Sequence, residues 1–69
     1  DISLIRGLHN ASERKKQTVR DLVHMVLAAG SVPLAEGVED EEDAQICRQM
    51  GFKLIQGYHT GKPIPADSL

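Results

Sequence analysis

The chain has 69 residues and a net charge of −2, so it forms at most one small domain with a small core. Aromatic residues make up 3% of it, namely Phe52 and Tyr58. That scarcity excludes a stacking platform for single-stranded nucleic acid, and the negative charge disfavours binding to a nucleic-acid duplex.

Residues 2–8 are mainly apolar and predict the end of a strand that runs into a loop. Ser12 is a candidate N-cap for the next helix, because its hydroxyl can accept a hydrogen bond from an otherwise unpaired amide. Residues 13–29 carry apolar side chains at three- and four-residue spacing, which predicts an amphipathic helix. Its apolar stripe consists of Val19, Leu22, Val23, Val26 and Leu27. Gly30 is the expected stop, since glycine readily adopts the left-handed conformation.

Residues 32–35 predict a short strand, in which Pro33 is tolerable because it stands near the start. Asp40 is a candidate N-cap for a second helix, and Asp43 follows at a spacing typical of a capping box. The acidic run of residues 39–43 is interpreted as solvated surface and as charge favoured at a helix N-terminus.

The second helix is expected to end at Gly51, and residues 52–56 then predict another strand that turns at Gly57. The segment from Pro63 to Pro65 is interpreted as loop packing that fixes the exit from this strand. Cys47 is the only cysteine, so an intramolecular disulfide is excluded, and we interpret it as a small packed hydrophobe.

Alternation of strands and helices predicts an α/β fold with parallel strands joined by crossover helices. Parallel sheets need cover on both faces, which two helices and three strands cannot provide. The chain also begins at Asp1 without a methionine and runs directly into an apolar stretch. We therefore expect either a homo-oligomer or one part of a larger α/β domain.

Ligands of α/β folds gather at the carboxyl ends of the parallel strands. Glu36 directly follows the second predicted strand and Gln56 closes the third, while Asp1 lies beside the first. Glu36 is the strongest candidate for catalysis or metal binding, although a glutamate in this position is often only a solvated loop residue. Glu39 is interpreted as a residue that holds the turn before the helix. The three histidines have no metal-ligand spacing, so we predict that none of them binds a metal.

Three segments resemble, in order and spacing, motifs of the EAL domain, the bacterial cyclic di-GMP phosphodiesterase family. They are Asp1-Ile2-Ser3-Leu4-Ile5, Ala35-Glu36-Gly37-Val38-Glu39, and Leu54-Ile55-Gln56-Gly57-Tyr58 with Gly61-Lys62-Pro63. The resemblance covers essentially all of residues 1–69 and implies the C-terminal part of a modified (β/α)8 barrel of the TIM type. It also implies a cytoplasmic bacterial signalling protein, which can be larger or membrane-anchored.

The resemblance implies that the complete domain hydrolyses cyclic di-GMP to linear pGpG with Mg²⁺ or Mn²⁺. In this family, the position of Glu36 helps hold a cation and its attacking water, and that of Gln56 lies close to the catalytic water. Asp1 and Glu39 match supporting positions.

The Glu-Ala-Leu signature and the other metal ligands of the family are absent from this chain. One carboxylate cannot hold a divalent site that needs several oxygen ligands, so we expect the isolated chain to be inactive. The alternative function is a non-catalytic, degenerate or truncated EAL-like module, which acts as a receptor or binds a partner or another copy of itself. Self-association would bury the apolar stripe. A further alternative is a small α/β regulator of another family. No apolar run reaches the length of a membrane span, so no membrane contact is expected from this segment.

Overall fold

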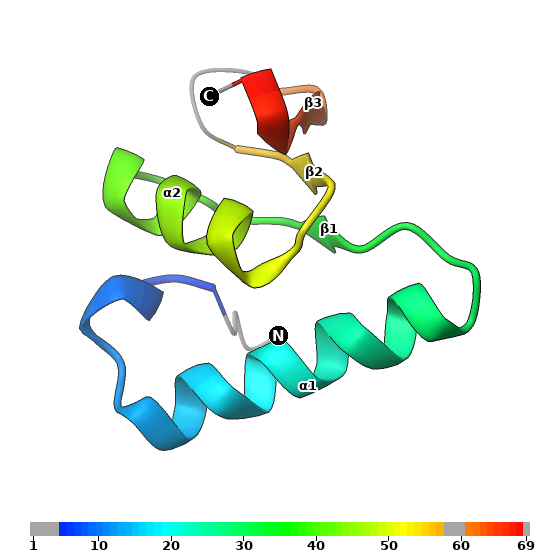
Figure 1. The fold of residues 1–69 in the computed structure, drawn as a ribbon. Coiled ribbons are helices and arrows are strands. Elements are labelled where there is room, and N and C mark those ends of the chain that lie inside the picture. Colours follow the sequence, from blue (N-terminus) through cyan, green and yellow to red (C-terminus); the bar gives the residue numbers. More distant parts are fainter. Residues whose placement is uncertain (1–4, 58–60, 69) are drawn as a thin grey trace.

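The computed structural model describes residues 5–57 and 61–68. Two α-helices and a three-stranded sheet form the body of the molecule, with a short 3₁₀ helix before the first α-helix and another after the last strand (Figure 1). Their bounds are η1 Leu8–Asn10, α1 Glu13–Ala28, β1 Leu34–Ala35, α2 Glu41–Met50, β2 Leu54–Ile55, β3 Ile64–Pro65 and η2 Ala66–Ser68. Of the predicted strand end and loop over residues 2–8, residues 2–4 lie outside the described residues, whereas residues 5–8 form a turn and the start of η1.

The ends of α1 agree with the sequence-based prediction. The Ser12 side chain accepts a hydrogen bond from the Lys15 amide at 3.1 Å, which confirms the N-cap. Gly30 follows the helix with a φ of 81°, in the left-handed region that glycine occupies without strain. The helix ends at Ala28, one residue earlier than expected.

The start of α2 agrees in part. Asp40 is the N-cap, and its carboxylate accepts a hydrogen bond from the Asp43 amide at 2.8 Å. In a capping box the side chain of the third helical residue reaches back to the cap. The Asp43 carboxylate instead accepts hydrogen bonds from Gly7 and His9, in the segment around η1.

The sheet has the order β1-β2-β3, with β1 and β2 parallel and α2 as the crossover between them. Ala35 pairs with Ile55 in this parallel ladder. The α/β class is therefore confirmed as a small two-helix, three-strand unit, whereas its place in a larger barrel stays a prediction.

One expectation about the sheet was wrong. The segment from Pro63 to Pro65 was expected to be loop, but Ile64–Pro65 forms β3, antiparallel to β2. Pro65 has no amide to donate, and proline is tolerated at a sheet edge, where β3 lies. The carbonyl of Lys53 accepts from the Ala66 amide at 2.9 Å, which continues the pairing beyond the proline.

The core lies between the sheet, α2 and the inner side of α1. Its buried members are Ile5, Leu8, Val19, Ala35, Val38, Ala44, Cys47, Met50, Ile55 and Ala66. No helix among the described residues is long and apolar enough to cross a membrane.

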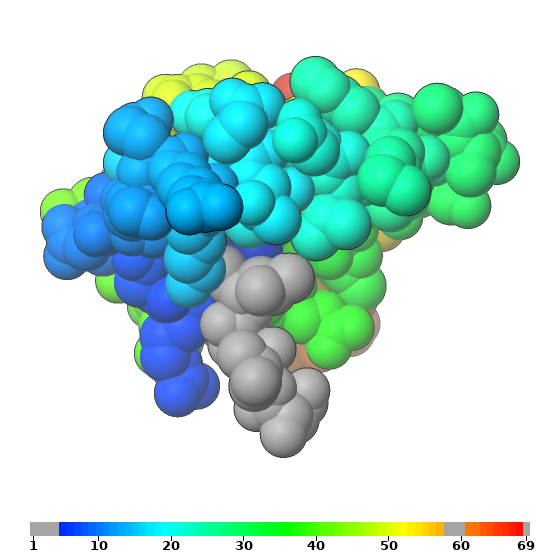
Figure 2. Space-filling view, turned by 90° about the horizontal axis from the view of Figure 1, so that it is seen from below, coloured from blue at the N-terminus to red at the C-terminus, as the bar shows by residue number. Residues whose placement is uncertain are grey.

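Only part of the predicted α1 stripe is buried. Val19 and Val23 are buried and Val26 is half-buried, but Leu22 and Leu27 are 42% and 38% exposed. Helix α1 runs along one side of the molecule and forms a ridge across the face in Figure 2. The described residues therefore cover only part of the predicted apolar stripe, because the surface that α1 packs against is narrower than its apolar face.

Candidate functional site

Glu36 and Gln56 lie at the carboxyl ends of the parallel strands β1 and β2, as the sequence predicted. We call the two segments that carry them, residues 35–39 and 54–57, the strand-end site. Each follows a residue of the parallel β1–β2 ladder, and the Gln56 amide donates to the carbonyl of Ala35 at 2.8 Å. The Val38 amide in turn donates to the Gln56 carbonyl at 3.2 Å. The backbones of these two segments are therefore hydrogen-bonded neighbours, with Glu36 exposed and Gln56 half-buried.

Gly57 makes this close approach possible. Its φ is 109°, and a Cβ placed there would lie 2.7 Å from the carbonyl oxygen of Val38 and 3.2 Å from the Val38 amide nitrogen. No real Cβ contact is as short as the first of these, so any other residue would push the two segments apart. The sequence indicates Gly57 only as a turn residue, because Val38, which it faces, is 19 residues away.

The amide side chain of Gln56 is held by a local contact. Its Nε2 donates to the carbonyl of Gly61 at 3.3 Å. An amide fixed in this way can help orient a water molecule, and the exposed carboxylate of Glu36, on the hydrogen-bonded neighbouring segment, can bind a hard cation.

Glu39 forms an ion pair with Arg6, with 3.3 Å between Oε2 and the guanidinium nitrogen. Both side chains are more than half exposed, and surface pairs of this kind contribute about 0–1 kcal/mol. The contact nevertheless joins the segment after the first predicted strand to the β1–α2 loop. Asp1, the other supporting candidate, lies outside the described residues.

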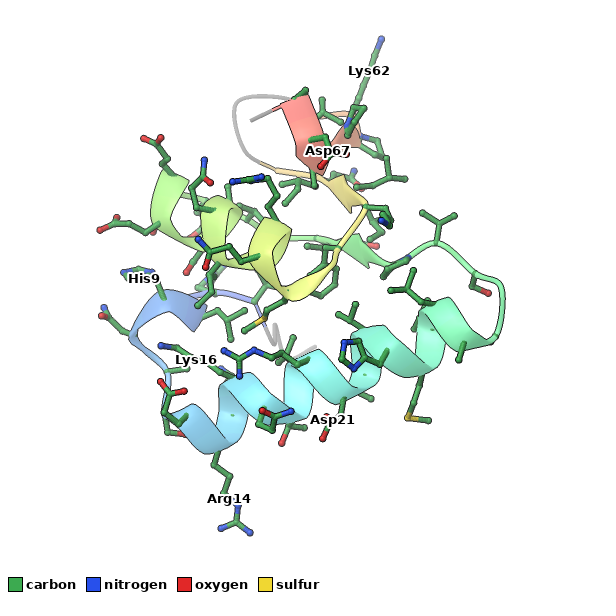
Figure 3. The ribbon with its side chains drawn as sticks, viewed as in Figure 1. His9, Arg14, Lys16, Asp21, Lys62 and Asp67 are labelled. Atoms are coloured by element: carbon green, nitrogen blue, oxygen red, sulfur yellow. The ribbon has the colours of Figure 1, made fainter. Side chains whose placement is uncertain are left out.

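A second polar cluster, which the sequence analysis missed, is centred on Asp43. This carboxylate is 1% exposed and accepts hydrogen bonds from the amides of Gly7 and His9, both at 2.9 Å. The His9 ring Nδ1 lies 2.7 Å from Asp43 Oδ1 (Figure 3 shows His9 beside α2). The signal in the sequence was an acidic residue on the otherwise apolar side of α2.

Both partners have shifted pKa values. The hydrogen bond to Asp43 raises the pKa of His9 above its ordinary value, against an opposing effect of burial. Burial alone would raise the pKa of Asp43, but the hydrogen bonds from His9 and Gly7 outweigh it and lower that pKa. These opposite shifts favour an ionised Asp43 paired with a protonated His9.

Three side chains near this cluster have the spacing of metal ligands. Ligand atoms of His9, Asp40 and Glu42 lie within 4.8 Å of one another. Asp40 already caps α2, and His9 Nδ1 already contacts Asp43. We interpret the group as an ion-pair network at the helix N-terminus, and it does not include Glu36.

Cys47 is fully buried, and burial raises the pKa of its thiol to about 12, with the negative charge of Asp43 acting in the same direction. A protonated, inaccessible thiol is a packing group rather than a nucleophile. The sequence-based interpretation of Cys47 is confirmed.

Comparisons with known proteins agree with these motifs. The family model of the EAL domain matches residues 1–63. A protein of Azorhizobium caulinodans, described as uncharacterized, is 38% identical over 56 residues, which are 81% of this chain and 8% of that protein. No solved structure matches the chain. Because the family match spans nearly the whole chain and both segments of the strand-end site, this chain belongs to the EAL domain family, the family of cyclic di-GMP phosphodiesterases.

Proposed function

We propose that this chain supplies the C-terminal part of the active site of a cyclic di-GMP phosphodiesterase. The observation that supports this most is the placement of Glu36 and Gln56 at the carboxyl ends of two hydrogen-bonded parallel strands. Ligands of barrel enzymes are bound at that end of the strands. The complete domain would convert cyclic di-GMP to linear pGpG.

In this proposal Glu36 is a metal ligand, Gln56 orients the attacking water, and Asp1 and Glu39 support the site. A bound Mg²⁺ or Mn²⁺ would activate water and neutralise charge on the phosphodiester. Among the described residues of the strand-end site, the Glu36 carboxylate is exposed to solvent, whereas Glu39 contacts Arg6. A hard divalent cation takes about six oxygen ligands, so the strand-end site provides only some of the ligands that the cation needs. The chain alone is expected to be inactive.

A chimera tests the proposal. Residues 1–63 would replace the matching segment of an active EAL phosphodiesterase, and linear product would be measured by mass spectrometry with Mn²⁺. We expect the chimera to hydrolyse cyclic di-GMP. Glu36→Ala should lower turnover by at least ~100-fold and Gln56→Ala by about 10- to 100-fold, since even indirect partners of a metal contribute this much.

Glu41→Ala is the matched control, because Glu41 is also an exposed glutamate but lies on α2. It should leave turnover unchanged. Full activity of the Glu36→Ala chimera, with retained Mn²⁺ dependence, would contradict the proposed role of Glu36.

A second candidate function, a non-catalytic module that binds another copy of itself, is favoured by exposed apolar side chains. Leu22, Met25, Leu27 and Val32 are between 38% and 67% exposed, and the first three lie on α1. Sedimentation velocity would test it: this function predicts a concentration-dependent dimer that Met25→Lys dissociates. A monomer at all concentrations would count against it.

A further inference from the structure

The Asp43 carboxylate is buried without any role in the proposed chemistry. Burying an ionised carboxylate is energetically costly unless hydrogen-bond donors replace the lost water. Here the donors come from Gly7 and His9, which are 36 and 34 residues away in sequence. We call this set of three contacts the Asp43–His9 clamp.

The clamp is connected to the strand-end site through the first turn of α2. The Asp43 amide is bonded to the Asp40 side chain and so fixes the first turn of α2, directly after the loop that carries Glu36. The middle of that loop is bonded to the next strand through Val38 and Gln56. The loop between β1 and α2 is therefore held at its centre by the sheet and at its end by the clamp.

We infer that Asp43 and His9 are positioning residues, which hold the segment after the first predicted strand against α2 and thereby fix the loop that bears Glu36. The consequence for catalysis rests on the proposed function, but the clamp itself does not. The Arg6–Glu39 ion pair joins the same two segments on the exposed side.

The clamp should depend on pH, because three carboxylates of the described residues all raise the pKa of His9. Asp43 contacts the ring, Asp40 Oδ1 is 3.9 Å from Nδ1, and the charge of Glu42 also raises the His9 pKa. All three lie on or directly before α2, while η1 itself contributes no other ionisable group.

The direction of each pH effect on stability follows from the pKa shifts of His9 and Asp43. The His9 pKa is raised, so its contribution to stability is complete below 6.5 and falls as pH rises through the folded-state pKa. The Asp43 pKa is lowered, so its contribution is complete above 3.8 and falls as pH drops through the folded-state pKa. Above the His9 pKa a neutral ring can still donate to the Asp43 carboxylate, but the attraction between two opposite charges is lost.

Nuclear magnetic resonance titration of the full chain tests this inference. The ring resonance of His9, assigned by its loss in His9→Gln, should titrate above 6.5. In Asp43→Asn the midpoint should move down toward 6.5, while Asp21→Asn, on the exposed side of α1, should leave it unchanged. The backbone amide of Val38 should follow the His9 midpoint in the wild type and lose that response in Asp43→Asn.

Each outcome decides a separate point. A His9 midpoint at or below 6.5 in the wild type would overturn the clamp, and so would a midpoint that Asp43→Asn does not move. An unfolded chain would give the first of these results. The positioning role would be overturned if the resonance of the Val38 amide did not change with the titration of His9. An inactive chimera with a normal clamp titration would count against the proposed function alone.

Discussion

At the scale of single residues, carboxylates in this chain differ through their neighbours rather than their type. Glu36 is open to solvent at the end of a strand, Glu39 pairs with Arg6, and Asp43 is buried beneath three donors. The first arrangement leaves oxygen atoms free to bind a cation. The last one consumes them in holding the backbone, so the most buried carboxylate is not the one we propose for catalysis.

Gly57→Ala tests the contact between the strand-end segments. The new Cβ would meet the Val38 carbonyl at 2.7 Å, at a φ of 109° that side chains rarely adopt. We expect a loss of about 1–3 kcal/mol in the free energy of unfolding, measured by urea denaturation. Gly61→Ala is the matched control, because none of the described residues comes within 4 Å of the position that its new methyl group would take, and it should change stability by less than about 0.5 kcal/mol. Equal effects of the two changes would contradict the close contact.

At the scale of elements, local signals set where each helix begins and tertiary contacts set how much of it is buried. Ser12 and Asp40 cap α1 and α2 through bonds to amides three residues ahead. In contrast, the apolar stripe of α1 is covered at Val19 and Val23 but not at Leu22.

Ser12→Ala tests the α1 cap. Loss of the hydroxyl leaves the Lys15 amide without its side-chain acceptor, and we expect a cost of about 1 kcal/mol in unfolding free energy by urea denaturation. Thr18→Ala removes a hydroxyl from the same helix that only donates to the Arg14 carbonyl, so its effect should stay within about 0.5 kcal/mol. A larger loss in Thr18→Ala than in Ser12→Ala would rule out the cap as the main stabiliser.

At the scale of the whole molecule, the small core has α2 at its centre. Helix α2 contacts η1, η2 and α1, and Ala44, Cys47 and Met50 point from it into the core. Detachment of any of these elements from α2 should therefore expose the interior side of this helix. Cys47 is for this reason a reporter of the intact fold.

The labelling rate of Cys47 measures this directly. A rise in the thiol pKa from 9.0 to about 12 lowers the thiolate fraction at neutral pH by ~1000-fold, in addition to the effect of burial. We expect very slow reaction with a thiol reagent under native conditions and a rise of at least ~1000-fold in urea. Fast native labelling at a rate independent of urea would show that α2 is not stably packed.

The amino-acid sequence was enough to predict the helix caps, the glycine stops, the α/β order, the family and the shared edge of Glu36 and Gln56. These depend on residues close in sequence, or on the rule that parallel strands end together. It took the folded arrangement to reveal that Ile64–Pro65 pairs with β2, that part of the α1 stripe stays exposed, and that Asp43 holds His9. The physical reason is distance along the chain: an acidic residue in a helix looks the same in sequence whether water or a backbone segment 34 residues away supplies its donors.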